Sequence, residues 1–207
     1  FLGDNGNYPD RHDVMIVGNH HAREWMSVQV PMLQVEVIAF SYGILAYDND
    51  GDGLVNEDHV DGKDDDADGQ TDEDWLGGNT EPETKFIQDL TEMNDDNGDG
   101  ASDFKTTLTW HSYSELVLWP WGHCTDCDNP DQEYLEFHGN VMGEMTDYAP
   151  MQSSDLYPTT GDFCDWHYGV HNSYCYTIEI GNAFHELPED IAHISVQNLG
   201  VPFYMVE

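Results

Sequence analysis

The chain has 207 residues and a formal net charge of −37, because 42 acidic residues face only five lysines and arginines. This charge repels phosphates, so nucleic acids and anionic membranes are disfavoured as partners. It favours a saline or calcium-rich medium, in which salt screens the repulsion between carboxylates. A hydrophobic content of 39%, with six tryptophans and eleven tyrosines, predicts one packed domain over residues 1–207.

Hydrophobic periodicity predicts that strands and helices alternate along the chain. Strands are expected near residues 12–18, 104–111, 115–119 and 174–180. Helices are expected at about residues 23–40, 82–93, 131–147 and 188–200. This alternation predicts an α/β fold: a three-layer α/β/α sandwich with a mixed, mostly parallel sheet.

The apolar stretch from Trp25 to Tyr47 is interrupted by polar residues and by one proline. These positions are Gln29, Pro31, Gln34 and Glu36. A membrane span needs about 20 consecutive apolar residues, so this stretch predicts a buried helix with a kink at Pro31. No membrane insertion is expected.

Three potential metal ligands follow two of the predicted strands. His21 and Glu24 come just after the strand near 12–18, and His111 ends the strand over 104–111. On a first helical turn His21 and Glu24 would lie on one side of the helix. Two imidazoles and one carboxylate, with a fourth position left for water, form the ligand set of a catalytic zinc site. On spacing alone, two solvated polar residues at a helix start are the more common meaning of such a pair.

Four sequence blocks stand in a fixed order around these residues. They are His21-Ala22-Arg23-Glu24-Trp25, His111-Ser112-Tyr113-Ser114, Leu118-Trp119-Pro120-Trp121-Gly122 and Tyr176-Thr177-Ile178-Glu179-Ile180. Tyr157 precedes Glu179 by 22 residues. In these blocks the chain resembles the zinc metallocarboxypeptidases of the carboxypeptidase A type. The resemblance implies a carboxypeptidase-like fold that is truncated at its N-terminus.

The resemblance also implies a role for each residue of the site. His21, Glu24 and His111 would hold Zn²⁺, and a zinc-activated water would hydrolyse the C-terminal peptide bond of a peptide or protein. Glu179 would be the general base and then the acid. The substrate would be bound by Arg23, Tyr157, Tyr113, Asp162 and Cys164.

Two of these residues have ordinary alternatives when the resemblance is set aside. Glu179 lies in an aromatic-rich strand, where burial is expected to raise its pKa toward the range useful for a base. Without the resemblance it would be a structural carboxylate with a hydrogen-bond donor nearby. Arg23 would be one partner of a surface ion pair. His20 is expected to lie beside the metal without binding it.

The chain lacks arginines that the resemblance leads us to expect. Family members bind the substrate carboxylate with an Asn-Arg pair and stabilise the oxyanion with another arginine, whereas this chain has only Arg11 and Arg23. Losing one oxyanion donor commonly lowers turnover by about 10²–10³-fold. Three explanations remain open: a deleted or incomplete sequence, replacement of the charges by Lys63, Lys85 or calcium, or zinc binding without efficient turnover.

These explanations leave two alternatives to a carboxypeptidase. One is a catalytically impaired pseudo-peptidase that acts as a zinc- and calcium-binding extracellular module. The other is an amidohydrolase of the same superfamily that acts on an N-acyl amino acid.

An acidic insert is expected at about residues 46–76. Its first segment, Asp48 to Asp58, recurs 16 residues later, and a shorter third copy begins at Asp95. Alternating oxygen ligands with glycine at the sixth position are typical of a Ca²⁺ loop. The copies resemble thrombospondin type 3 or dockerin-like repeats, although a solvated acidic loop is the usual meaning of a charge run. The candidate ligands are Asp48, Asp50, Asp52, Asp58, Asp64, Asp66, Asp68, Asp74, Asp95, Asn97, Asp99 and Asp103.

Four cysteines are compatible with two disulfides in a secreted, extracellular protein, and three pairings are possible. Cys124 and Cys127 have a C-x-x-C spacing, which also occurs in redox and metal sites. Cys164 and Cys175 flank part of the region between Tyr157 and Glu179. Phe1 as the first residue indicates a processed product or a fragment.

Overall fold

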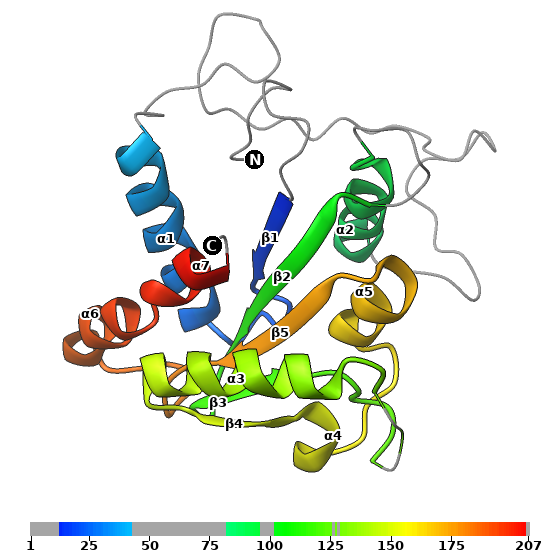
Figure 1. Cartoon of the computed structure of the whole chain (residues 1–207). Coiled ribbons are helices and arrows are strands. Elements are labelled where there is room, and N and C mark those ends of the chain that lie inside the picture. Colours follow the sequence, from blue (N-terminus) through cyan, green and yellow to red (C-terminus); the bar gives the residue numbers. More distant parts are fainter. Residues whose placement is uncertain (1–12, 43–81, 96–101, 126, 128, 206–207) are drawn as a thin grey trace, which may run out of the picture. The chain divides into compact units, whose positions relative to one another are not determined.

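The computed structural model describes residues 13–42, 82–95, 102–125, 127 and 129–205 (Figure 1). The chain divides into two compact units, one comprising Phe1–Ile38 and Asp103–Glu207 and the other Ala39–Ser102. The expected acidic insert at about 46–76, with the first two calcium loops, lies outside the described residues.

A five-stranded sheet forms the centre of the first unit. Its strands are β1 (Asp13–Gly18), β2 (Phe104–His111), β3 (Leu116–Trp119), β4 (Ala149–Gln152) and β5 (Tyr174–Glu179). Their spatial order is β1-β2-β5-β3-β4, so β1 and β4 are the outermost strands within the described residues. Among the strands that the structure describes, three neighbouring pairs are parallel, and β3 and β5 run antiparallel. The predicted mixed, mostly parallel sheet is confirmed.

Alternate residues of the central strands face opposite layers of helices, because side chains along a strand point to the two faces in turn. Trp110 and Ile178 belong to a hydrophobic core together with Met26 of one helix and Ile194 of another. On the opposite face, Cys175 is bonded to a third helix. The predicted three-layer arrangement follows from these contacts.

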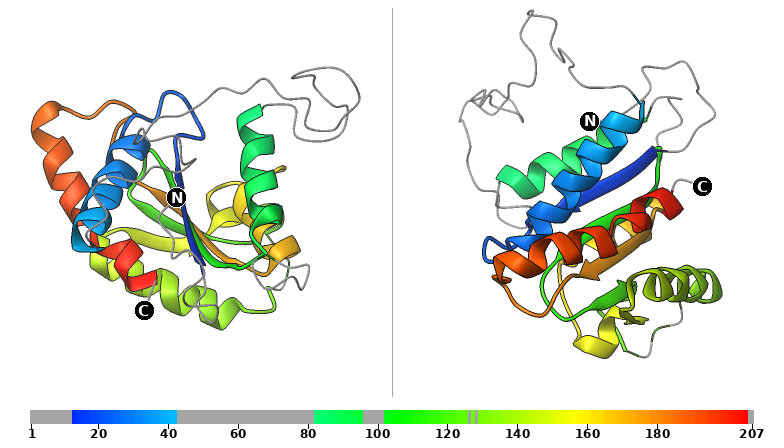
Figure 2. Two further views of the ribbon diagram at one scale, coloured as in Figure 1. Left: turned by 90° about the horizontal axis from the view of Figure 1, so that it is seen from above. Right: turned by 90° about the vertical axis from the view of Figure 1, so that its left-hand side faces the viewer.

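The first unit's helices are α1 (Met26–Tyr42), α3 (Gln132–Thr146), α4 (Ser153–Leu156), α5 (Phe163–His171), α6 (Pro188–Gln197) and α7 (Gly200–Met205). Figures 1 and 2 show α1, α6 and α7 on one side of the strands and α5 on the other. The last residues of α1 extend beyond the boundary at Ile38.

One predicted helix is divided in the structure. The sequence predicts a single helix over about 188–200, whereas α6 ends at Gln197 and α7 begins at Gly200. Pro202 has no backbone N–H and cannot continue the ladder of hydrogen bonds. Asn198 caps α6 instead, and both its backbone and its side-chain nitrogen donate to the carbonyl oxygen of Ile194.

In the second unit the described element is α2 (Pro82–Met93), which confirms the helix expected at 82–93. Proline at its first position suits a helix start, where no N–H is needed. Lys85 forms an ion pair with Asp89 one turn later, at 2.6 Å. None of the helices in the described ranges is long and apolar enough to cross a membrane.

Two disulfides settle the pairing that the sequence leaves open. Cys124 is bonded to Cys127, and Cys164 is bonded to Cys175. The second bond joins the first turn of α5 to β5, and both of its cysteines are buried. It therefore fixes the first turn of α5 against the start of β5, the strand that ends at Glu179.

Candidate metal and catalytic site

The first two candidate ligands lie on a tight turn between β1 and α1. The backbone N–H of Glu24 donates to the carbonyl oxygen of His21 at 3.0 Å, and the Ser27 hydroxyl donates to the Glu24 carbonyl at 2.6 Å. Ser27 Oγ also accepts from the backbone N–H of Asn19 at 3.0 Å. The sequence places these ligands on the first turn of a helix beginning near residue 23. That expectation is wrong by one turn, since α1 begins at Met26.

Gly18 makes this turn possible because β1 and α1 approach each other closely. A Cβ atom at Gly18 would lie 2.0 Å from the carbonyl oxygen of Ser27 and 3.1 Å from Cγ of Pro31. No real side chain tolerates the first distance. The proline contributes as well, because it lacks the N–H that would normally bond to the carbonyl of Ser27.

The third candidate ligand reaches the turn from the adjacent strand. β1 and β2 are parallel neighbours, so Gly18 and His111 lie at the same edge of the sheet. Glu24 connects the two imidazoles: Oε1 lies 2.6 Å from Nδ1 of His21, and Oε2 lies 3.2 Å from Nδ1 of His111. One ligand atom from each of the three side chains lies within 4.8 Å of the others. The three side chains are therefore close enough to share one metal ion.

The carboxylate of Glu24 suits a cation. Its side chain is buried, and burial alone would raise its pKa, but contacts with His111 and His21 outweigh this and hold the pKa below its usual value. Glu24 is thus ionised although its side chain is buried. Oε2 has no hydrogen bond of good geometry among the described residues. An ionised, buried oxygen of this kind beside two imidazoles fits Zn²⁺, which takes nitrogen and carboxylate oxygen ligands.

Glu179 lies next to this cluster. It ends β5 and is the register partner of His111 on β2, and the backbone N–H of Ile180 donates to the carbonyl of His111 at 3.0 Å. Burial, with a smaller contribution from the charge of Glu24, raises the pKa of Glu179 to about 8. The expectation that burial raises this pKa is confirmed. A carboxyl that titrates in this range can exchange protons near neutral pH.

Arg23 and Tyr113 meet at an aromatic residue that the sequence does not single out. The guanidinium of Arg23 lies over the ring of Phe184, 4.1 Å from its centroid. The ring of Tyr113 meets the same ring edge to face at 4.8 Å. Phe184 thus brings together two candidate substrate-binding residues, and it holds Arg23 by a cation–π contact.

The remaining candidate substrate residues differ in accessibility. Tyr157 follows α4 and is 60% exposed. Asp162 caps α5 by accepting a hydrogen bond from the backbone N–H of Asp165 at 3.0 Å, and burial raises its pKa. Cys164 is only 2% exposed, and its sulfur is bonded to Cys175. Cys164 therefore braces α5, and Asp162 is the more accessible of the two.

His20 lies beside His111, one of the three candidate ligands. Its ring centroid lies 5.1 Å from that of His111 and 5.3 Å from that of Phe163. It is thus a neighbour of the three candidate ligands.

Most of the candidate calcium ligands lie outside the described residues. Of the third loop, Asp95 follows α2 and Asp103 precedes β2, whereas Asn97 and Asp99 fall in the undescribed part. The backbone N–H of Asp95 donates to the carbonyl of Met93 at 3.0 Å.

A comparison with known families agrees with the site. The sequence model of the zinc carboxypeptidase family matches residues 52–199. The chain belongs to this family. The matched range includes His111 and Glu179 but begins after His21 and Glu24. The assignment of His21 and Glu24 as candidate ligands therefore depends on the geometry of the turn after β1.

Individual carboxypeptidases match shorter parts of the chain. A zinc carboxypeptidase of Saccharothrix mutabilis subsp. capreolus is 40% identical over 86 residues, covering 39% of this chain and 20% of that protein. Carboxypeptidase O of Bos taurus is 29% identical over 110 residues, covering 50% of this chain and 28% of that protein. The chain thus spans only 20–28% of the length of these relatives.

The fold is similar to that of a solved carboxypeptidase. The crystal structure of carboxypeptidase A from Helicoverpa armigera matches with a TM-score of 0.65 at 14% sequence identity. The match covers 95% of this chain and 61% of that chain. This similarity confirms the predicted carboxypeptidase-like fold.

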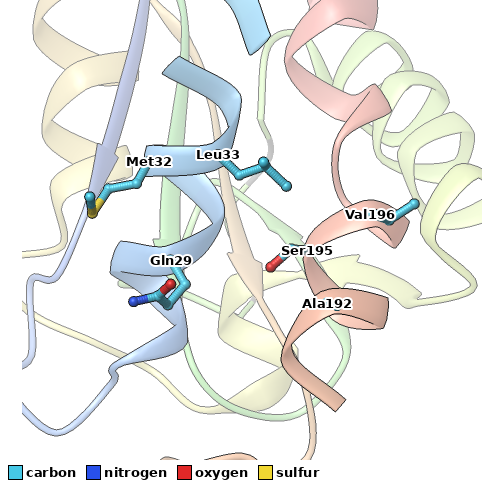
Figure 3. Close-up of a pocket in the computed structure, with 6 residues that line it drawn as sticks. All are labelled: Gln29, Met32, Leu33, Ala192, Ser195 and Val196. Atoms are coloured by element: carbon cyan, nitrogen blue, oxygen red, sulfur yellow. The ribbon is translucent and has the colours of Figure 1, made fainter. Parts of the chain in front are cut away.

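A groove of about 380 Å³ lies between α1 and α6 (Figure 3). Its lining residues are Gln29, Met32, Leu33, Ala192, Ser195 and Val196. None of these side chains is an acid, a base or a candidate zinc ligand. The groove therefore adds no catalytic group to the site formed by His21, Glu24, His111 and Glu179.

Proposed function

We propose that the chain is a secreted zinc metallocarboxypeptidase that hydrolyses the C-terminal peptide bond of peptides or proteins. The observation that carries the proposal is that His21, Glu24 and His111 converge beside Glu179, at one edge of a carboxypeptidase-like sheet. Family membership supports a carboxypeptidase-type function. The metal ligands would be the two histidines and Glu24.

Zinc, when bound, supplies a Lewis acid and lowers the pKa of a coordinated water to about 7. Glu179 is the base that accepts a proton in this proposal and later donates it to the leaving amine. Its raised pKa fits both directions of transfer. Arg23, held over Phe184, binds carbonyl groups of the substrate, and the exposed Tyr157 donates a hydrogen bond from its phenol. Tyr113 and Asp162 complete the substrate-binding set, and Cys164, whose sulfur is bonded to Cys175, supports this set from within α5.

The proposal is tested with pairs of chromogenic peptides that differ only in having a free or an amidated C-terminus. We expect hydrolysis of the free peptide, loss of activity with a chelator, and recovery after zinc is restored. The amidated peptide should be cleaved much more slowly. If neither peptide is hydrolysed in a chelator-sensitive way, the result contradicts a peptidase function. Hydrolysis of acyl-amino acids alone would indicate an amidohydrolase.

The arginine content favours a second candidate function, a pseudo-peptidase that binds metal without efficient turnover. The sequence has two arginines, Arg11 and Arg23, and Arg23 is the one within the described residues. Lys85, considered as a replacement, is paired with Asp89. One zinc per chain without hydrolysis of any free C-terminus would support this candidate.

We also propose that the aspartate repeats bind Ca²⁺ as an insert within a single domain of residues 1–207. The support is the register of the three copies, with carboxylates at alternate positions and glycine at the sixth. Calorimetric titration with Ca²⁺ should show saturable binding that weakens when Asp64 and Asp68 are changed to asparagine. Equal heats for Ca²⁺ and Mg²⁺ in both proteins would contradict specific calcium loops.

A further inference from the structure

A short loop after β3 contacts the chain on both sides of Tyr157. We refer to residues 121–124 as the 121–124 loop and to residues 157–161 as the Tyr157 segment. The loop leads into the Cys124–Cys127 disulfide. The Tyr157 segment connects α4 to Asp162, the residue that caps α5.

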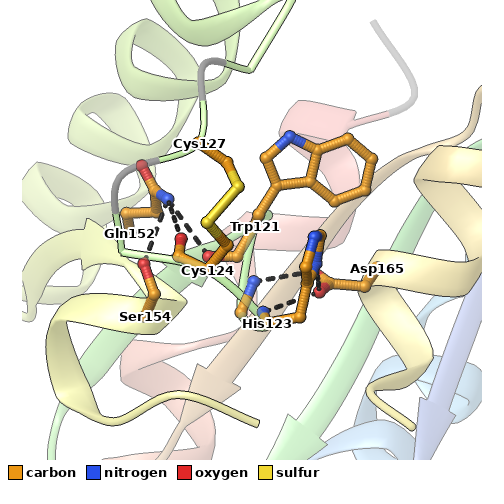
Figure 4. The surroundings of a disulfide bond; sticks show 8 residues. Trp121, His123, Cys124, Cys127, Gln152, Ser154 and Asp165 are labelled. Atoms are coloured by element: carbon orange, nitrogen blue, oxygen red, sulfur yellow. Dashed lines mark hydrogen bonds and ion pairs between the residues drawn. A yellow bond between two sulfur atoms is a disulfide. The ribbon is translucent and has the colours of Figure 1, made fainter. Parts of the chain in front are cut away.

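Asp165 holds the 121–124 loop with three contacts (Figure 4). Its Oδ1 accepts from the backbone N–H of Gly122 at 2.8 Å. Its Oδ2 accepts from the backbone N–H of His123 at 2.9 Å and lies 2.6 Å from Nδ1 of the same histidine. The Asp165 side chain is only 12% exposed, whereas that of His123 is 49% exposed. Both carboxylate oxygens are therefore used to fix the loop.

The loop in turn holds the Tyr157 segment. The carbonyl of Gly122 accepts from the backbone N–H of Thr159 at 2.9 Å. The approach is close, because a Cβ atom at Gly122 would lie 2.7 Å from Oγ1 of Thr159 and 3.6 Å from Cγ of Asp162. Gly122 is thus bound to Asp165 through its nitrogen and to the Tyr157 segment through its oxygen.

The start of α4 is anchored to the same loop. The carbonyl of Trp121 accepts from the backbone N–H of Ser154 at 3.2 Å and from Nε2 of Gln152 at 3.1 Å (Figure 4). The loop therefore contacts Ser154 before Tyr157, Thr159 within the Tyr157 segment, and Asp165 after it. Tyr157 itself is 60% exposed between these anchors.

We propose that Asp165 is a positioning residue for substrate binding. It acts through Gly122 and His123 to hold the Tyr157 segment in the position from which the phenol of Tyr157 can reach a bound peptide. This inference rests on the proposed carboxypeptidase function, in which Tyr157 contacts the substrate and Asp165 does not.

The test compares Asp165→Asn with Asp190→Asn. Both residues lie in the first turn of a helix, so both substitutions remove a favourable charge from a helix N-terminus, but Asp190 is exposed on α6. A charge-assisted hydrogen bond contributes a factor of about 10 or more, so we expect Asp165→Asn to raise KM about 10-fold with a smaller change in kcat. Asp190→Asn should leave both unchanged.

A double-mutant cycle with Tyr157→Phe separates positioning from a general loss of structure. If Asp165 acts through Tyr157, its substitution should change KM less than about 2-fold in the Tyr157→Phe background, because coupled residues are not additive. His123→Gln, which leaves both backbone donors in place, should show a weaker form of the same effect. Additive effects of Asp165→Asn and Tyr157→Phe on KM overturn the proposal.

Hydrogen exchange gives a readout that does not depend on catalysis. The amide of Thr159 should exchange about 10-fold faster in Asp165→Asn than in the Asp190→Asn control, because local opening controls exchange. Unchanged exchange at Thr159 overturns the link between Asp165 and the segment. If the parent chain has no peptidase activity but the two variants still differ in exchange at Thr159, the proposed function is contradicted. The link between Asp165 and the Tyr157 segment is then still established.

Discussion

Burial shifts the pKa values of Glu179 and His167 in opposite directions for the same reason. Removing water disfavours the charged form, which is the anion of a carboxyl and the cation of an imidazole. The pKa of Glu179 rises to about 8, with Glu24 adding to the effect of burial. The pKa of His167, which is fully buried, falls to about 4, with His171 adding to the effect. The first shift bears on activity and the second on stability.

Glu179→Gln should lower kcat by about 10²–10⁴-fold, the usual contribution of a general acid–base group. Zinc content should stay the same, because the amide does not disturb His21, Glu24 or His111. A base must be ionised, so kcat/KM of the parent should fall as the pH drops below the pKa of Glu179. Steady-state kinetics and metal analysis check both points.

Glu189→Gln on α6 provides the matched control, since Glu189 is exposed and carries the same substitution. It should hydrolyse the peptide at the parental rate. Full activity in the Glu179→Gln chain would remove Glu179 from the mechanism.

His167 should make the folded state sensitive to acid. Its pKa is lower in the folded chain than in the unfolded chain, so the unfolded state binds the proton more readily. Stability is then complete above pH 6.5 and decreases as the pH falls toward 4. The decrease of this pKa from 6.5 to about 4 corresponds to a loss of about 3 kcal/mol in the free energy of unfolding.

The measurement is the free energy of unfolding between pH 4 and 7 for the parent and for His167→Gln. In the parent, the hydroxyl of Thr107 lies 2.9 Å from Nδ1 of His167. The variant should lose less unfolding free energy at low pH, because glutamine can still bond to this hydroxyl but does not titrate. Identical slopes in the two proteins would show that His167 does not control the acid transition.

At the scale of elements, the junction of β1 and α1 determines whether the metal site forms. Gly18→Ala would force a methyl group against the Ser27 carbonyl, which is backbone and cannot rotate away. We expect a loss of about 1–3 kcal/mol in unfolding free energy, as for other overpacked sites. Zinc affinity should fall as well, because His21 and Glu24 follow the junction. A Gly18→Ala chain that binds zinc and unfolds like the parent would contradict this explanation.

The elements that the sequence predicts well have strong local patterns. β2 occupies residues 104–111 and α2 residues 82–93, as expected, because each has a continuous pattern and clear ends. β4 is missed because it has only four residues, with Pro150 among them. α5 is missed although Asp162 and Asn172 are suitable caps, since its nine residues mix aromatic and polar side chains without a clear period.

The candidate site divides in the same way. His21, Glu24, His111 and Glu179 belong to recognisable motifs, and the parallel order of β1, β2 and β5 brings them to one edge. The contacts of Phe184 with Arg23 and of Asp165 with His123 join residues far apart in sequence. No local pattern encodes such pairs, so only the folded chain reveals them.

At the scale of the whole molecule, a net charge of −37 should make stability depend on ionic strength. The Debye length falls from about 10 Å at 0.1 M salt to about 3 Å at 1 M, so added salt weakens the repulsion among carboxylates. One kcal/mol corresponds to about 2–4 °C in Tm for a chain of this size, and we expect an increase of several degrees.

Thermal unfolding in NaCl and in choline chloride, both with a calcium chelator, checks this expectation. Screening depends on ionic strength alone, so the two salts should act alike. A Tm that is constant or decreases with NaCl would show that self-repulsion does not limit stability.

Among the described strands, β1 lies at an edge of the sheet and has β2 as its one neighbour. Two candidate ligands follow β1 and the third ends β2, so a shared ion would cross-link the outermost strand to the interior. Withdrawing that ion would leave the N-terminal part of the described fold held by one ladder and its packing alone. Chelation should then expose this part to proteases before the rest of the sheet, and the metal would govern how long the protein survives as well as what it does.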